Sequence, residues 1–302
     1  MGLTLNAVSS EASGQEDIYS PRWGLARSDP SQRRLTALHT DVQLVLIPVA
    51  VTDPLQRPVL DLPKENFRIF DDGIEQKISA FFLEEAPVSV GMVFDASNSM
   101  RKKIGDSRQA LTEFLHMSTP GDEFSLWKFS DRPQKVCPFT TDPAEIEGGL
   151  ADIQPGGWTS LFDALYLALS QMKRATHGTK ALFVLSDGGD NNSRYTEGEI
   201  KNMVREVDVR VFSISIFDHS PVLERISDES GGRFYRVHKL DELPAMTAKL
   251  SGEIHSHYVL GYLPTKPQND GKYHKVVVKL VPPPRSPRLQ VAWRRGYYAL
   301  SH

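Results

Sequence analysis

The sequence lacks the features that mark several large classes of protein. It has a single cysteine, Cys137, which excludes an internal disulfide bond and is interpreted as a small apolar strand residue. Its net charge of -3, with both signs interspersed, provides no basic field for nucleic acid and no acidic tail. No apolar run is long enough for a signal peptide or a membrane span. The 302 residues allow one large domain or two modest ones.

Residues 88–99 combine an apolar strand with a run of oxygen donors. Val, Met and Phe dominate residues 88–94, which predicts a buried strand that ends at Asp95. Ser97 and Ser99 follow at alternate positions, so the loop that leaves the strand can turn three oxygen donors toward one point. Ligands bind at the carboxyl ends of strands in open α/β sheets, and hard divalent cations such as Mg2+ prefer oxygen ligands. The stretch therefore predicts a cation site, and the absence of Cys and His from it disfavours zinc.

Two further loops complete a family resemblance. The D-x-S-x-S pattern after the strand resembles the signature of the metal-ion-dependent adhesion site (MIDAS) of von Willebrand factor A domains. Residues 156–161, GGWTSL, resemble the second metal loop of that family, which supplies a threonine. Residues 184–188, VLSDG, resemble the third loop, which supplies an aspartate after a strand, and the three loops follow the family order and spacing. The metal ligands that the resemblance implies are Asp95, Ser97, Ser99, Thr159 and Asp187.

The function that the resemblance implies is metal-dependent binding. Three neutral hydroxyls and only two carboxylates would leave a divalent cation incompletely neutralised, so the ion would stay attractive to an outside anion. The implied cofactor is Mg2+, with Mn2+ and Ca2+ as alternatives. The implied partner is a protein or peptide with an exposed carboxylate. The basic run at residues 101–103 either steers such a partner or forms a solvated first helical turn.

A metal-dependent hydrolase, in which the ion activates water, is the alternative function. Such an enzyme needs a base beside the metal, and the three loops contain no His, Lys or Glu apart from the basic run. The chain also has no GxSxG elbow, no Walker loop and no CxxC pair. Binding without catalysis is therefore the favoured interpretation.

The chain divides into a leader, a central segment and two flanks. Residues 1–37 are polar and without sustained periodicity, which predicts a flexible leader. Residues 86–253 alternate strands and helices, which predicts a doubly wound, mostly parallel, Rossmann-like α/β sheet, the expected von Willebrand factor A domain. The strands expected there are residues 88–94, 123–129, 135–140, 181–185, 209–216 and 233–237, and a final helix is expected at residues 240–254.

The two flanks, residues 38–85 and 254–300, are rich in predicted strands, and each is too small to stand alone. We expect them to pair as one β-sandwich into which the central domain is inserted. Asp71-Asp72-Gly73 predicts a hairpin in which residues 76–82 return along the strand at residues 67–70, giving about three strands before the central domain.

The flanks also resemble a bacterial VWFA-related family described in Acidobacteria, through NFRIFDDG at residues 66–73, YVLGY at 258–262 and RRGYY at 294–298. That resemblance implies an extracytoplasmic or secreted protein, although this chain shows no signal peptide. In related A domains, rearrangement of the metal loops is linked to movement of the final helix. A shift of residues 240–254 on partner binding would then pull on the second flank and change the interdomain angle. The alternative is a rigid scaffold in which this helix does not move.

Overall fold

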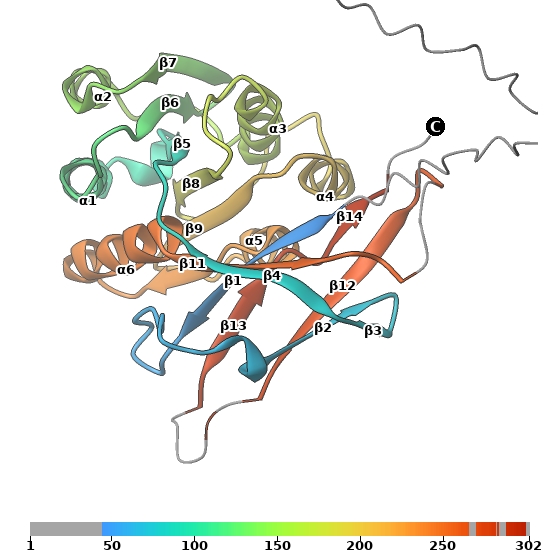
Figure 1. The fold of residues 1–302 in the computed structure, drawn as a ribbon. Helices are drawn as coiled ribbons and strands as arrows, with labels where there is room; N and C mark the ends of the chain where they lie inside the picture. The colour runs from blue at the N-terminus through green and yellow to red at the C-terminus, as the bar shows by residue number, and fades with distance from the viewer. Residues whose placement is uncertain (1–43, 266–269, 282, 284–287, 300–302) are drawn as a thin grey trace, which may run out of the picture. The chain divides into compact units, whose positions relative to one another are not determined.

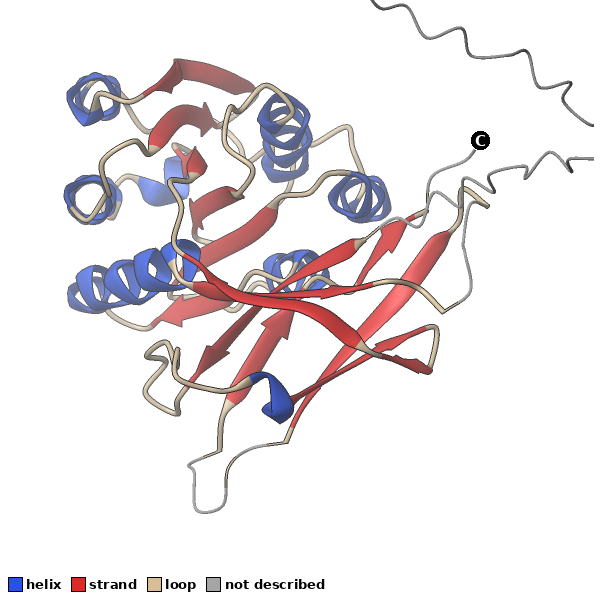
Figure 2. Cartoon of the chain, viewed as in Figure 1, coloured by secondary structure: helices blue, strands red, loops and turns tan. Residues whose placement is uncertain are grey.

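A computed structural model of the chain describes residues 44–265, 270–281, 283 and 288–299. The expected leader, residues 1–37, lies outside the described residues. The described chain forms one sheet of six strands and two sheets of four strands (Figure 1). In Figure 2 the α-helices lie around the six-stranded sheet. None of the helices in the described ranges is both long and apolar enough to cross a membrane.

The six-stranded sheet is parallel except for one edge strand, as the sequence predicts. Its order is β10-β9-β8-β5-β6-β7, and only β7 runs antiparallel to its neighbour. Every residue of β5 and of β9 is buried, because helices cover both faces of a parallel sheet. The strands are β5 (Ser89–Asp95), β6 (Glu123–Phe129), β7 (Pro133–Thr140), β8 (Lys180–Ser186), β9 (Arg210–Ile216) and β10 (Phe234–Val237).

Three helices pack on each face of this sheet. Side chains alternate along β5, so Phe94 packs in the same apolar cluster as Phe114 of α1, while Val93 packs in the cluster that contains Leu165 of α3. The doubly wound α/β architecture is thereby confirmed. One face carries α1 (Ile104–His116), α2 (Pro143–Ala151) and α6 (Leu243–His255); the other carries α3 (Leu161–Met172), α4 (Glu197–Glu206) and α5 (Pro221–Ser230).

The sequence did not predict α2, because Gly148 and Gly149 weaken its helical signal. The second glycine has a packing role in the structure. A Cβ at Gly149 would lie 2.6 Å from the sulfur of Cys137, so only glycine lets the helix approach β7 this closely. Cys137 is buried in that contact, as its interpretation as an apolar strand residue requires.

Each of the other two sheets combines strands from both flanks. Their orders are β13-β1-β11-β4 and β14-β12-β2-β3. β1 and β4 both pair with β11, and β2 pairs with β12, so strands from before the six-stranded sheet depend on strands that follow it. The strands are β1 (Val45–Thr52), β2 (Phe67–Asp71), β3 (Ile74–Gln76), β4 (Ile78–Glu84), β11 (His257–Tyr262), β12 (Tyr273–Leu280), β13 (Gln290–Trp293) and β14 (Gly296–Tyr298).

The two four-stranded sheets share one hydrophobic core. The ring of Phe67 in β2 lies 5.0 Å from the ring of Tyr258 in β11 and 5.5 Å from the ring of Phe81 in β4. Ile69 and Leu260, from the two different sheets, belong to the same buried cluster. Apolar faces that neither flank could cover alone are thus buried against each other.

The predicted hairpin is only partly right. Asp72 and Gly73 both have positive φ, 46° and 83°, which is typical of the tight turn that joins two antiparallel strands. Only the short strand β3 returns along β2, however, and the chain then crosses to the other sheet, where β4 pairs with β11. The crossing places Phe81 against Tyr258, and it gives the first flank four strands rather than about three.

We predict that residues 38–85 do not fold when expressed alone, whereas residues 86–253 do. The strands of the first fragment would lose their partners β11 and β12, while the second fragment keeps all six strands and, apart from Ile254, both apolar clusters of its sheet. Amide NMR spectra of the two fragments test this. A dispersed, folded spectrum from residues 38–85 would contradict the shared core.

Candidate metal centre

The five predicted ligands lie at or just beyond the carboxyl ends of two neighbouring parallel strands, or in the loop that enters α3. Asp95 is the last residue of β5, and Ser97 and Ser99 follow it around a short helical turn, Asn98–Met100. Asp187 comes directly after β8, which pairs with β5. From these two ends the chain leaves toward α1 on one face and α4 on the other, and this divergence is where open α/β sheets bind ligands.

Hydrogen bonds tie the three loops together. The backbone N–H of Gly156 donates to the carbonyl of Ala96 at 2.8 Å, and the N–H of Asn98 donates to the carbonyl of Gly157 at 3.1 Å, which joins the first loop to the second. The N–H of Thr159 donates to the side-chain oxygen of Asn191 at 2.9 Å, and the N–H of Asn191 donates back to the carbonyl of Thr159 at 3.0 Å. The loop that follows Asp187 is thereby joined to the second loop.

The backbone conformation of Gly157 and the space around it require a glycine in the second loop. Its φ is 80°, and a Cβ there would lie 2.6 Å from a carboxylate oxygen of Asp131. The same carboxylate accepts a hydrogen bond from the N–H of Trp158 at 2.8 Å. Only glycine satisfies both the left-handed backbone and the close approach, so Gly157 shapes the second loop.

Asp95 is a fully buried carboxylate with an exposed fraction of 0%. One of its oxygens accepts the backbone N–H of Ser97 at 2.8 Å, and the other accepts the hydroxyl of Ser186 at 2.6 Å. Burial raises the pKa of the Asp95 carboxyl to about 6 and the negative charge of Asp187 adds to the rise, while the hydrogen bonds from Ser186 and Ser97 act in the opposite direction. The hydroxyl oxygens of Ser97 and Ser99 lie 2.9 Å apart on the same loop.

Lys103 occupies an unexpected position beside Asp187. Its ammonium group donates to the Asp187 carboxylate at 2.8 Å, and its side chain is only 14% exposed. The same ammonium lies 5.2 Å from the ring centre of Phe217, a residue with a φ of 70° at the end of β9. Both interpretations of the basic run are therefore wrong for Lys103, which is neither a solvated residue nor a free steering charge.

The sequence patterns missed three residues that shape the centre: Ser186, Lys103 and Asn191. Ser186 stands within the VLSDG motif, immediately before Asp187, and its place at the end of the apolar run 181–185 was the available signal. Nothing in the spacing of Lys103 or Asn191 indicates their contacts, which depend on how the loops pack.

The residues present fit a divalent cation. All five side chains offer oxygen atoms, as a hard cation prefers. The negative charge of Asp187 raises the pKa of Asp95, so a positive ion beside both carboxylates would relieve their repulsion.

Comparison with known families decides the identity of this part of the chain. Residues 90–189 match the model of the von Willebrand factor type A domain, a range that contains all five predicted ligands. The chain contains a von Willebrand factor type A domain. Its A domain accounts for the six-stranded sheet and the order of the metal loops, whereas the resemblance of the flanks to the acidobacterial family stays a prediction.

Curated relatives show the same likeness over part of their length. The chain is 31% identical over 175 residues to inter-alpha-trypsin inhibitor heavy chain H4 of Homo sapiens, and 29% identical over 179 residues to the Bos taurus protein of the same name. Each match covers 52% of this chain and 19% of the relative. The chain thus corresponds to about a fifth of either heavy chain.

Solved structures support the fold. A von Willebrand factor type A protein from Catenulispora acidiphila has a TM-score of 0.51 and 13% identity, over 87% of this chain and 75% of that one. Proximal thread matrix protein 1 from the mussel byssus has a TM-score of 0.50 and 16% identity, over 59% of this chain and 49% of that one. Another structure of the mussel protein, with a TM-score of 0.49, is described as having a zinc-occupied MIDAS motif.

We predict that Asp95→Asn stabilises the metal-free protein at pH 7. Because the folded-state pKa of Asp95 is raised from 3.8 to about 6, the folded state binds more protons between these values, and stability falls as pH rises through that window. Removing the buried charge should recover up to about 3 kcal/mol at pH 7, at 1.36 kcal/mol for each pKa unit, and little at pH 4. Thermal unfolding in EDTA at both pH values measures the effect, and a lower midpoint for the variant at pH 7 would contradict it.

We also predict that Lys103→Met tightens Mg2+ binding, by about tenfold or 1.4 kcal/mol. The substitution removes a positive charge that competes for the Asp187 carboxylate, and it keeps the apolar stem against Phe217. Lys102→Met is the matched control, because Lys102 is exposed. Calorimetric titration that finds weaker Mg2+ binding in Lys103→Met would show that the ammonium supports the ion rather than competing with it.

Proposed function

We propose that this protein is a metal-ion-dependent binding module that recognises an acidic group of a protein or peptide partner. Asp95 and Asp187, with the hydroxyls of Ser97, Ser99 and Thr159, would hold the divalent cation, with Mg2+ as the first candidate. The bound cation would supply a positive charge to which a carboxylate of the partner can bind.

The observation that carries this proposal is a buried carboxylate beside uncharged hydroxyl groups that can act as metal ligands. Asp95 is fully buried, its pKa is raised to about 6, and the nearby Asp187 carboxylate contributes to the rise. The other three side chains are neutral hydroxyls, so two negative charges face a doubly charged ion. The ammonium of Lys103 pairs with Asp187 and adds one positive charge, so the centre with its ion would be net positive, which favours a partner that brings its own carboxylate.

The surface around the centre suits an acidic partner. Trp158, directly before Thr159, is 64% exposed, and an exposed Trp beside a charged centre is a frequent anchor in protein interfaces. Arg101 and Lys102 are exposed on the first loop, where the guanidinium of Arg101 is held at 2.9 Å by the side-chain oxygen of Asn98. The rim therefore offers one aromatic surface and two positive charges.

Binding is favoured over hydrolysis by the contacts of the two carboxylates. The hydrogen-bond partners of Asp95 and Asp187 in the described chain are two serines and Lys103. A serine hydroxyl is a weak base, and an ammonium group that is paired with a carboxylate has no lone pair to accept a proton. A base that activates a metal-bound water is thus missing from these contacts.

The final helix favours the rigid scaffold over the switch. The guanidinium of Arg210 in β9 donates to the carbonyls of Glu253 and Ile254 at 3.2 and 2.8 Å, and the buried Glu253 carboxylate accepts from Arg233 at 2.8 Å. These bonds fix the carboxyl end of α6, which passes to β11 through Ser256 alone. A movement of α6 would have to break them.

We predict that binding of acidic peptides requires both the cation and Asp95. On an array of peptides that carry single Asp or Glu residues, the full chain should bind in Mg2+ and lose binding in EDTA. Asp95→Ala should abolish both Mg2+ binding in calorimetry and peptide binding, whereas Trp158→Ala should keep Mg2+ affinity and lose about 2 kcal/mol of peptide affinity, the scale of an interface anchor.

Lys64→Met is the control. Lys64 is exposed in the short helical turn Lys64–Asn66 before β2, so the change should affect neither Mg2+ binding nor peptide binding. Peptide binding that persists in EDTA, or undiminished Mg2+ binding in Asp95→Ala, would refute the proposed function.

A further inference from the structure

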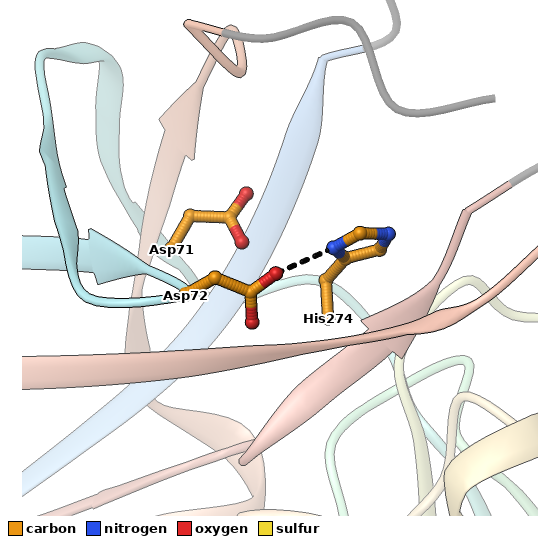
Figure 3. Close-up of side chains that lie close together, drawn as sticks. All are labelled: Asp71, Asp72 and His274. Atoms are coloured by element: carbon orange, nitrogen blue, oxygen red, sulfur yellow. Dashed lines mark hydrogen bonds and ion pairs between the residues drawn. The ribbon is translucent and has the colours of Figure 1, made fainter. Parts of the chain in front are cut away.

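A second cluster of potential metal ligands lies in the sheet that contains β2 and β12. One carboxylate oxygen of Asp71, one of Asp72 and one ring nitrogen of His274 all lie within 4.8 Å of one another. Asp71 ends β2, Asp72 begins the turn to β3, and His274 lies in β12, which pairs with β2. Figure 3 shows the three side chains close together, with a dashed line for the hydrogen bond between Asp72 and His274.

Asp71 has an unsatisfied oxygen in a buried position. The residue is only 2% exposed, and its Oδ2 accepts hydrogen bonds from the hydroxyls of Tyr262 and Tyr297, both at 3.0 Å. Its Oδ1 is buried and has no hydrogen-bond partner among the described residues. A buried carboxylate oxygen without a partner is costly, so an atom that binds there is expected.

Each of the other two side chains is anchored at one atom, and their second atoms are hydrogen-bonded to each other, so a metal ion would replace the proton between them. Asp72 Oδ1 accepts the backbone N–H of Lys275 at 2.9 Å, and its Oδ2 faces His274 Nδ1 at 2.8 Å. His274 Nε2 lies 3.1 Å from a carboxylate oxygen of Asp270. A histidine that binds a metal commonly donates its other ring N–H to a carboxylate in this way, which fixes its orientation.

We propose that Asp71, Asp72 and His274 form a binding site for a divalent transition-metal ion such as Zn2+. The donor set mixes two carboxylates with an imidazole, and an imidazole favours a transition metal over Mg2+ or Ca2+. His274 would bind through Nδ1. Asp270 would hold the other ring nitrogen of His274, and the hydroxyls of Tyr262 and Tyr297 would hold Asp71 through Oδ2. The side chains of Asp72 and Asp270 are 45% and 40% exposed, so an ion can enter from solvent.

A simpler interpretation is a salt bridge in which a protonated His274 joins Asp72 to Asp270. That arrangement satisfies the histidine and both exposed carboxylates. It leaves Asp71 Oδ1 buried without a partner, whereas an ion bound through that oxygen would pair it as well. The metal site therefore accounts for the whole cluster, and the salt bridge for only part of it.

Zinc titration of the full chain tests the proposal. The parent for this test carries Asp95→Ala, the change predicted above to abolish ion binding at the A-domain centre, and the buffer contains excess Mg2+. We expect calorimetry to find one Zn2+ equivalent, and we expect the isosteric changes Asp71→Asn and Asp72→Asn to weaken it at least tenfold. Asp270→Asn should weaken zinc binding about 10-fold to 100-fold, the usual loss on removing a carboxylate that orients a ligand histidine.

The matched control is His255→Gln. His255 also faces a buried carboxylate, Asp122 at 2.8 Å, but it belongs to no three-ligand cluster in the described chain, so its loss should leave zinc affinity unchanged. Circular dichroism identifies any variant that fails to fold, and the folded ones among Asp71→Asn and Asp72→Asn decide the result. No zinc binding by the parent, or equal affinity in these two variants, would overturn the proposal whatever the outcome at the A-domain centre.

Discussion

The buried carboxylate of Asp95 is the constraint on which the candidate metal centre depends. A charged group at 0% exposure loses its hydration, and the hydrogen bonds from Ser97 and Ser186 replace only part of it. The fold keeps this group at the end of its central strand, beside the strand that leads to Asp187. A buried carboxylate with a raised pKa marks a candidate functional site, and here the surrounding oxygen atoms suit a cation.

The order of the strands explains why distant segments meet at this point. β5 lies between β8 and β6, and the chains that leave β5 and β8 turn to opposite faces of the sheet. The loop before α3 fills the opening between them, held by backbone bonds from Gly156 and Asn98. Residues separated by more than sixty positions in the sequence thus become neighbours through the strand order and these loop hydrogen bonds.

Much of the A domain could be predicted because its signals are local. The inner strands β5, β8 and β9 are largely apolar runs, and each proposed ligand stands at a fixed place in a loop motif. The structure differs from the predictions made from the sequence where the outcome depends on tertiary packing. Gly149 lowers the helical signal of α2 in the sequence, although the structure needs a glycine there for the close approach to Cys137. β4 does not continue the hairpin with β2, because Phe81 packs on Tyr258 in the other sheet. Lys103 was placed wrongly because its partner Asp187 follows 84 residues later.

A manganese anomalous-scattering experiment tests the central claim most directly, because it locates the ion without altering any side chain. Crystals of the full chain grown with Mn2+ should show an anomalous peak bounded by oxygen atoms of Asp95, Ser97, Ser99, Thr159 and Asp187. Such a peak would establish that the three loops form one metal centre. Crystals in which manganese is bound elsewhere in the molecule while that position holds no ion would contradict the account.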